Sequence, residues 1–540
     1  MCKKRLTFRH GVVIFSAMQS ILNNFQINSR SCGGDPDGAL PEALSCHFGV
    51  PLATIRNVTI LNRSVDSRRG DPTLNYKLLI DTADEVAAHF TPATDEELAA
   101  LAPVRPELPA STLMHPLVLG TGPAGVFGAL MLALAGCRPV VLDRGREVAK
   151  RVADHEKFLR TRELDEESNL LIGEGGAGTF SDGKLYTGTR DVRGRFVIDA
   201  LIEAGAPPEI RFHSRPHVGS DHLRKTCAAL RRRIIDLGGE FRFGAHVREL
   251  VTKNGGFAGV KLADGEILEG AALLFAPGLG GRDLVRELAA RFGGAESKPF
   301  QIGCRIEHPQ EFIDFRQYRG SRPECLGAAE YHIAAGGVSS FCMCPGGTLV
   351  NASAWSEHSC TNGMSDHARS GAFANAALIA TLRPEEFASP EEPFALIDKL
   401  EREIFRHGGS DYTFPAQDAA SFLRGEKRLS RREGSAETGY TPARIDDLLP
   451  QRIRDTLAKA LREFDRKMPG FIRHGVFVGA EPCVSSPLRL TRNELGEWSA
   501  LPRVYPAGEG VGAAGGIVSA ACDGMRAAEA MLRAFPKPGA

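Results

Sequence analysis

The sequence predicts an α/β fold with a parallel sheet, and three stretches of the chain carry this prediction. Residues 117–143 (LVLGTGPAGVFGALMLALAGCRPVVLD) read as an apolar strand, a glycine turn, an apolar helix and a second strand. The segment ALLFAPG at 272–278 reads as another buried strand that ends in glycine. Near the C-terminus, a strand to Ala507 is followed by a glycine turn and a helix from about Gly516. Strands that alternate with helices favour parallel pairing in one sheet.

The turn at 120–125 has the spacing of a dinucleotide-binding turn. Gly120 allows the tight turn, Gly122 lets the backbone approach a pyrophosphate, and Gly125 lets the helix pack closely on its strand. The helix from about Pro123 to Ala135 presents unpaired N–H groups to that pyrophosphate. An ordinary turn is the alternative, but the strand before it and the helix after it both favour a ligand.

An acidic residue follows at the expected distance. Asp143 ends the run PVVLD, where a ribose diol needs an acceptor, and this favours FAD or NAD over NADP. The residues nominated here as cofactor-binding are Gly120, Gly122, Pro123, Ala124, Gly125, Asp143 and Arg144.

Length and composition set outer limits on the protein. The 540 residues contain 66 Lys and Arg against 66 Asp and Glu, so bulk charge indicates no nucleic-acid partner. Twelve scattered cysteines and the lack of a 20-residue apolar run favour a reduced, cytoplasmic protein without an integral membrane segment.

The N-terminal fifth of the chain divides into an extension and a small domain. Residues 1–33 combine basic residues with GVVIFSAM, which faintly resembles a signal peptide. We expect instead a poorly ordered or variable extension, or a start placed too far upstream. Residues 34–110 predict a small α/β domain without a cofactor motif, and the proline-rich RPELPAS links it to the glycine turn.

A glycine-rich loop follows the charged helix REVAKRVADHEKFL. GEGGAGTFSDGKL at 173–185 is too rich in glycine for a helix or strand interior and suits close approach to a phosphorylated or flat ligand. A flexible linker is the alternative. The loop nominates Gly175, Gly176, Gly178, Thr179 and Ser181 for the cofactor, and Lys184 as the preferred side chain near the flavin or substrate.

The C-terminal strand, turn and helix indicate a long ligand with two ends. NAD does not need a second helix N-terminus aimed at the same crevice, whereas FAD does. Glu509 follows the strand and is placed to accept from a ribityl hydroxyl. The cofactor set is completed by Val247, Gly278, Gly508, Glu509, Gly515, Gly516 and Ile517.

Candidate catalytic residues lie in GCRIEHPQ of the middle block. Arg305 and Glu307 share one face of a strand, so an ion pair between them competes with a functional role. His308 titrates near neutral pH and is a candidate proton donor, with a structural histidine as the alternative. We interpret Cys342 and Cys344 as buried free thiols. No motif indicates a metal site.

Seven motifs follow one another between about residues 40 and 535: LGTGPAGVFGAL, SNLLIGEGGAGTFSDGKLYT, RPHVGSDHL, KPFQIGCRIEHPQ, SFCMCPGG, NGMSDHARSGAFANAAL and YPAGEGVGAAGGIVSAACDG. In this order they resemble a largely uncharacterised family of bacterial FAD-dependent dehydrogenases. The resemblance implies a glutathione-reductase-type FAD-binding Rossmann-like fold with an inserted α+β substrate domain. The expected FAD-binding segments are 111–298 and 471–540, on either side of an insert at 299–470.

The chain departs from the family pattern at two places. Leu279-Gly280 stands where a His-Ser pair is expected, and EPCVSSP replaces ETRTSSP, so that Pro482 and Cys483 stand for threonine and arginine. An arginine lost near flavin or substrate changes the expected charge of the substrate.

The leading hypothesis is an oxidoreductase that transfers hydride between FAD and an unidentified small organic substrate. A second glycine fingerprint is absent, so we expect a transient NAD(P)H or a protein as electron donor. One alternative is a membrane-peripheral reductase of polyisoprenoid or other lipid substrates, which predicts a large apolar cavity in 299–470. A flavin-dependent RNA-modifying protein is the third, and neutral charge weighs against it.

Overall fold

The computed structural model describes residues 17–188, 190–431 and 433–537, which separate into two compact units. The first unit runs to Ala102 and takes in two short segments from later in the chain, Arg211–Ser214 and Pro323–Leu326. The second unit contains the rest of the chain. Among the described residues, no helix is long and apolar enough to cross a membrane.

The N-terminal unit is an antiparallel sheet of order β1-β3-β2 with short helices. Alternate residues of β3 are buried, which gives the sheet one apolar face. The expectation of a poorly ordered extension over 1–33 is wrong for 17–28, because these residues form β1 and their backbone pairs with β3. Residues 1–16 lie outside the described residues. The elements are β1 (Ala17–Asn28), α1 (Leu40–Phe48), β2 (Ile55–Asp66), β3 (Thr73–Ala83) and α2 (Asp95–Ala99).

The second unit is built on a five-stranded parallel sheet of order β22-β10-β4-β5-β6. Strands β4, β10 and β22 are buried along their whole length, and they are accordingly short apolar runs rather than alternating ones. This parallel sheet confirms the predicted α/β class. The strands are β4 (Leu117–Leu119), β5 (Val140–Asp143), β6 (Glu240–Phe243), β10 (Leu273–Phe275) and β22 (Val504–Pro506).

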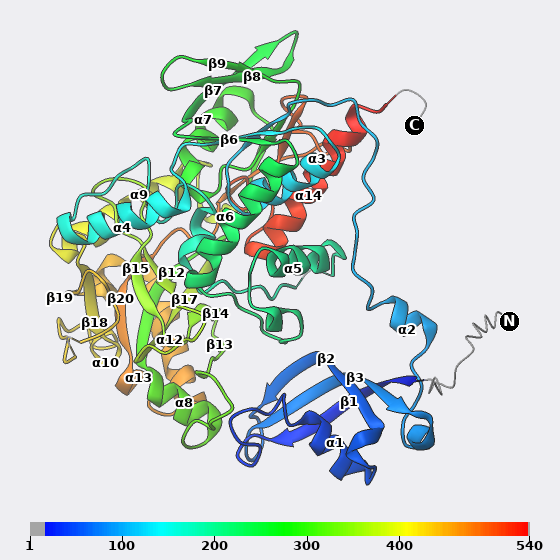
Figure 1. Ribbon diagram of the computed structural model, residues 1–540. Helices are drawn as coiled ribbons and strands as arrows, with labels where there is room; N and C mark the ends of the chain where they lie inside the picture. The colour runs from blue at the N-terminus through cyan, green and yellow to red at the C-terminus, as the bar shows by residue number, and fades with distance from the viewer. Residues whose placement is uncertain (1–16, 189, 432, 538–540) are drawn as a thin grey trace. The chain divides into compact units, whose positions relative to one another are not determined.

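Helices from the early and the late part of the second unit's sequence cover this sheet. Among them, α3 and α14 lie side by side (Figure 1). Their contact is close because both carry glycine there: a Cβ on Gly524 would lie 1.9 Å from the carbonyl oxygen of Ala124. A small antiparallel sheet of β7, β8 and β9 stands beside it. The elements are α3 (Pro123–Leu134), α4 (Val148–Thr161), α5 (Arg193–Glu203), α6 (Ser220–Asp236), β7 (Val247–Lys253), β8 (Gly256–Leu262), β9 (Ile267–Glu269), α7 (Arg282–Phe292) and α14 (Ile517–Ala534).

The inserted part forms a seven-stranded mixed sheet of order β13-β14-β17-β12-β20-β18-β19. Strand β20 lies beyond the expected boundary at 470, so the insert extends further along the chain than predicted. Two-stranded ladders β15–β16 and β11–β21 complete the strands. The elements are β11 (Ala295–Ser297), β12 (Phe300–Pro309), α8 (Gln310–Tyr318), β13 (Ala334–Ala335), β14 (Val338–Cys344), β15 (Thr348–Asn351), β16 (Thr361–Met364), β17 (Phe373–Leu382), α9 (Glu392–Gly408), β18 (Phe414–Asp418), α10 (Ala419–Phe422), β19 (Tyr440–Pro442), α11 (Ile445–Leu448), α12 (Gln451–Lys467), α13 (Phe471–His474), β20 (Val476–Glu481) and β21 (Leu488–Leu490).

Candidate functional site

One cavity of roughly 1060 Å³ runs through the second unit. Its walls come from the glycine turn after β4, the loops that follow β5 and β10, the start of β7, and the segment between β22 and α14. Strands of the insert line it as well. The cavity therefore joins the parallel sheet, where a nucleotide binds at the carboxyl ends of strands, to the inserted domain.

The glycine turn takes the predicted strand–turn–helix form. Gly120 has φ 97°, and a Cβ there would lie 2.1 Å from the carbonyl oxygen of Ala276. A Cβ on Gly125 would lie 1.9 Å from the carbonyl oxygen of Gly120. Gly122 instead has open space around its Cβ position and lines the cavity with Pro123 and Ala124. The turn thus leaves room at one glycine, at the N-terminus of α3, for an anionic group.

Asp143 lies at the end of β5 and lines the cavity, but its carboxylate is already bonded within the protein. Its Oδ2 accepts from the N–H of Thr121 at 3.0 Å and from that residue's hydroxyl, and Oδ1 accepts from the N–H of Gly145 at 2.8 Å. Asp143 therefore fixes the turn, and its proposed role toward a ribose stays a prediction. Arg144, Val247 and His246 line the same end of the cavity.

The glycine loop at 173–185 is held by a buried arginine that the sequence did not reveal. Arg151 of α4 donates to the carbonyl oxygen of Asn169 at 2.8 Å and to those of Glu174 and Gly176. Its guanidinium lies 4.9 Å from the ring centroid of Phe180, and Arg224 lies 5.1 Å from the same ring. These contacts give the loop fixed partners, unlike a flexible linker.

Only part of the nominated loop residues reach the cavity. Gly176, Gly178 and Ser181 line it, whereas Gly175 and Thr179 do not. The Thr179 hydroxyl donates to the carbonyl oxygen of Glu174 at 3.0 Å, so it closes the loop on itself.

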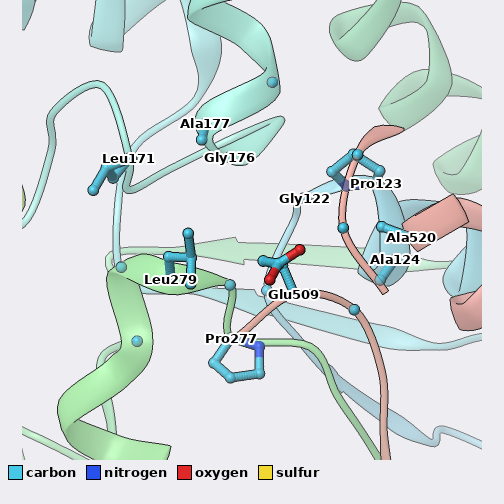
Figure 2. Close-up of a pocket in the computed structure, with 18 of the residues that line it drawn as sticks. Gly122, Pro123, Ala124, Leu171, Gly176, Ala177, Pro277, Leu279, Glu509 and Ala520 are labelled. Atoms are coloured by element: carbon cyan, nitrogen blue, oxygen red, sulfur yellow. The ribbon is translucent and has the colours of Figure 1, made fainter. Parts of the chain in front are cut away.

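The segment after β22 brings a carboxylate to the middle of the cavity. Figure 2 shows Glu509 between the turn residues Gly122–Ala124 and the segment Pro277–Leu279. Its Oε1 accepts from the N–H of Ser486 at 3.4 Å, and burial raises the pKa of its carboxyl above the usual 4.5. The nominated residues that also line this part are Gly278, Gly508, Gly515, Gly516 and Ile517.

Side chains build the opposite end of the cavity. Lys184 Nζ lies 2.5 Å from Asp182 Oδ2, and the guanidinium of Arg369 binds the two oxygens of the same carboxylate at 2.5 and 2.8 Å. Burial alone would raise the pKa of Asp182, but the charges of Lys184 and Arg369 hold it below its usual 3.8. One carboxylate is thus shared by two cations, and Lys184 is the one that lines the cavity.

Neutral polar groups accompany Lys184. Cys342 and Cys344 both line the cavity, at a bulge of β14 where Cys342 has φ 42°. Burial raises the pKa of the Cys342 thiol to about 12, so both sulfurs are protonated thiols at neutral pH. Other residues that line this end, which the sequence did not nominate, are Tyr186, Gln301, His332, Ser340, Phe341 and Asn362.

The other three catalytic candidates do not line the cavity. Arg305 and Glu307 do not form the ion pair that their spacing suggested: Arg305 binds Glu481 at 2.8 Å, and Glu307 binds Arg431 at 2.9 Å. Both are buried within the seven-stranded sheet. His308 lies at 2.8 Å from the carbonyl oxygen of Phe471, and burial lowers its pKa to about 3. A histidine that stays neutral there supports the structural alternative.

Among the described residues, one group of His358, Asp398 and Glu401 has the spacing of metal ligands. Arg282 already occupies it, with donors 2.6 Å from Asp398 and 2.7 Å from Glu401. The guanidinium supplies the positive charge that a cation would bring.

The lining of the cavity fits FAD by its own chemistry. Open space at Gly122 and the N-terminus of α3 suit a pyrophosphate, and a Cβ on Gly515 would lie 2.0 Å from Glu509 Oε2, so the carboxylate needs that glycine. A parallel sheet with such a two-ended cavity defines a dinucleotide-binding protein of the flavoprotein class.

Comparison with known proteins places the chain in a family. Residues 299–482 match the family described as FAD-dependent protein, C-terminal domain-like. An uncharacterized protein of Clostridium beijerinckii is 37% identical over 537 residues, which cover 95% of this chain and 99% of the relative. The chain therefore belongs to this family of FAD-dependent proteins, and FAD is its cofactor.

Solved structures resemble the chain far more weakly. CtdE in complex with FAD aligns at 11% identity and a TM-score of 0.33, over 77% of this chain and 83% of that chain. Glycine oxidase from Bacillus cereus aligns at 9% identity and a TM-score of 0.31, over 78% and 98%. At these values the likeness carries no argument about substrate.

Proposed function

We propose that this protein transfers hydride between FAD and a small polar organic substrate held at the Lys184 end of the cavity. The observation that carries the proposal is the continuity of one cavity from the glycine turn to Lys184. When bound, FAD supplies the hydride chemistry itself. The protein supplies orientation, charge and access at each end.

At the nucleotide end, the N–H groups at the start of α3 bind the pyrophosphate and Glu509 accepts from a ribityl hydroxyl. At the other end, Lys184 donates to an anionic or carbonyl oxygen of the substrate. Burial alone would lower the pKa of Lys184, but the ionised Asp182 carboxylate beside it raises that pKa above its usual 10.5. Lys184 therefore stays charged through neutral pH and orients the substrate rather than taking its proton.

Polar groups near Lys184 favour this substrate class over a lipid. Gln301, Asn362, Ser340 and two thiols line the insert side, together with Phe341 and Ile379. A polyisoprenoid would leave these polar groups without hydrogen-bond partners, which costs free energy. No observation of the described residues favours an RNA substrate.

The experiment is an anaerobic screen in which the FAD-loaded protein is mixed with fractionated metabolites, NADH and NADPH, and flavin absorbance is followed. We expect a small polar metabolite to reduce or reoxidise the flavin. Lys184→Met should raise the KM for that compound about tenfold or more, and Lys184→Arg should restore much of it.

Equal KM values in wild type and Lys184→Met, with FAD fully bound, would contradict the role of Lys184. A response confined to long-chain lipids would favour the lipid alternative. Rapid reduction of the flavin by NADH or NADPH at micromolar concentration would indicate a nicotinamide site. It would contradict the hypothesis that the electron donor is a protein.

A further inference from the structure

Two cysteines of the N-terminal unit lie side by side although 293 residues separate them in the sequence. The Sγ atoms of Cys32 and Cys325 are 3.1 Å apart, and both thiols are free and partly buried. Cys32 follows β1, and Cys325 lies on the segment Pro323–Leu326, which belongs to the same compact unit. Thiols of distant segments lie this close only where the fold holds both segments in place.

A fixed backbone carbonyl gathers the two thiols. The Cys325 Sγ lies 3.2 Å from the carbonyl oxygen of Ser29, and the Cys32 Sγ lies 3.6 Å from the same oxygen. Ser29 is itself buried and doubly tied, since its N–H and its hydroxyl both donate to the carbonyl oxygen of Pro72, at 3.0 and 2.7 Å. The sulfurs are therefore held against a rigid point at the end of the sheet.

A neighbouring residue of each segment also lies close to the other segment. A Cβ on Gly34 would lie 3.3 Å from Oε1 of the Glu324 side chain, so the loop after Cys32 passes close to the residue before Cys325. The pair thus differs from Cys342 and Cys344, which are separated by one residue on a bulged strand and line the cofactor cavity.

We propose that Cys32 and Cys325 are a modification site at which hydrogen peroxide forms a reversible disulfide. The Cys32 sulfur attacks the peroxide, an S–O bond forms, the O–O bond breaks, and one water leaves with the thiol proton. The Cys325 sulfur then attacks Cys32, the S–S bond forms, and a second water leaves with the Cys325 proton. The two thiols lose two electrons, which the peroxide gains.

The order of attack follows from the surroundings of Cys325. Burial and the hydrogen bond with Cys32 raise the pKa of the Cys325 thiol to about 12, and the nearby Arg63 charge opposes this only in part. Cys325 therefore stays protonated at neutral pH and acts second. A cation beside the pair also stabilises the anionic sulfur that each step requires.

The test uses the full-length, FAD-loaded protein, reduced and then exposed to hydrogen peroxide before digestion with trypsin under non-reducing conditions. Cys32 lies in the tryptic peptide 31–56, and Cys325 in 320–369 because the Arg322–Pro323 bond resists cleavage. We expect these two peptides to be joined, with the loss of two hydrogen atoms, and to separate again on treatment with dithiothreitol.

Peptide 31–56 also contains Cys46, which is exposed, so Cys46→Ser is the matched control. The cross-link should persist in Cys46→Ser and disappear in both Cys32→Ser and Cys325→Ser. The Tm of wild type should rise on oxidation and return on reduction, while the Tm of either serine variant should not respond.

A peroxide-treated Cys46→Ser protein without the joined peptides would overturn the proposal, and this variant leaves the pair itself untouched. A cross-link that fragmentation assigns to Cys342, Cys344 or Cys360 instead of Cys325 would also overturn it.

Discussion

The two ends of the cavity are built from different material. At the nucleotide end, the backbone of 120–124 and 176–178 lines the cavity together with Gly508, Gly515 and Gly516. The opposite end is lined by side chains from distant segments, among them Lys184 and Asp182, and Arg369 binds Asp182 from outside the cavity. The first end depends on glycines that leave room beside the backbone, and the second depends on charged side chains that meet there. Substitutions therefore damage the two ends in different ways.

The largest effects are expected at the glycine turn, where a substitution at one glycine should lower stability and a substitution at another should lower the affinity for FAD. Gly125→Val should destabilise the protein by more than about 4 kcal/mol, because its Cβ would overlap the carbonyl oxygen of Gly120. Gly122→Val should fold, because its Cβ position is open, and yet bind FAD at least about 100-fold more weakly. Thermal unfolding and flavin fluorescence titration measure the two quantities.

Full FAD occupancy in Gly122→Val would show that the pyrophosphate lies elsewhere. A wild-type Tm in Gly125→Val would contradict the close packing of α3 on β4.

The next largest effect is expected at the opposite end. Asp182→Asn leaves Lys184 and Arg369 facing each other without their shared carboxylate and should cost about 3–5 kcal/mol of stability. The folded-state pKa of Asp182 lies below its usual 3.8, so its contribution is present above that pH and is lost as the pH falls toward the folded value. Urea unfolding between pH 3 and 7 measures both the stability loss of the variant and the pH dependence. A variant as stable as wild type at pH 7 would contradict a stabilising role for the charge cluster.

A smaller effect is expected where the two ends meet. Glu509→Ala should weaken FAD binding about tenfold through the lost acceptor, and Glu509→Gln should retain much of the affinity. Isothermal titration of the flavin-free protein with FAD distinguishes the variants. Equal affinity in all three proteins would remove Glu509 from the cofactor site.

The smallest effect on turnover is expected at His308. Because burial lowers its pKa from the usual 6.5 to about 3, the unfolded chain takes up a proton that the folded protein does not. Wild-type stability should therefore fall from pH 6.5 toward pH 3, and His308→Asn should flatten part of that fall while kcat near pH 7 stays unchanged. A loss of kcat with normal stability would return His308 to the list of proton donors.

The same contrast explains what the sequence could predict. The helix after the glycine turn was expected at about Pro123 to Ala135 and is found at Pro123–Leu134, because its turn, its apolar run and its ends are all local. Most nominated cofactor residues line the cavity for the same reason. Nothing local indicates that Thr121 and Gly145 would occupy the oxygens of Asp143.

The missed residues depend on distant contacts. Arg151 and Arg369 are ordinary helix and loop arginines in sequence, and their roles arise only when the chain brings carbonyl and carboxylate oxygens to them. Arg305 and Glu307 show the opposite error, since a shared strand face suggested a pair and neighbouring strands supplied better partners. Pairing between strands, rather than spacing along one strand, decides such cases.

The contact of α3 with α14 also determines when, during synthesis of the chain, the FAD-binding fold can be completed. The strand β22 and the helix α14 are synthesised after the whole insert, yet they complete the sheet and cover the apolar face of α3. A ribosome therefore releases the glycine turn long before the partner that completes its fold. A nascent chain arrested before Val504 should retain no flavin, so cofactor loading belongs to the last stage of biosynthesis.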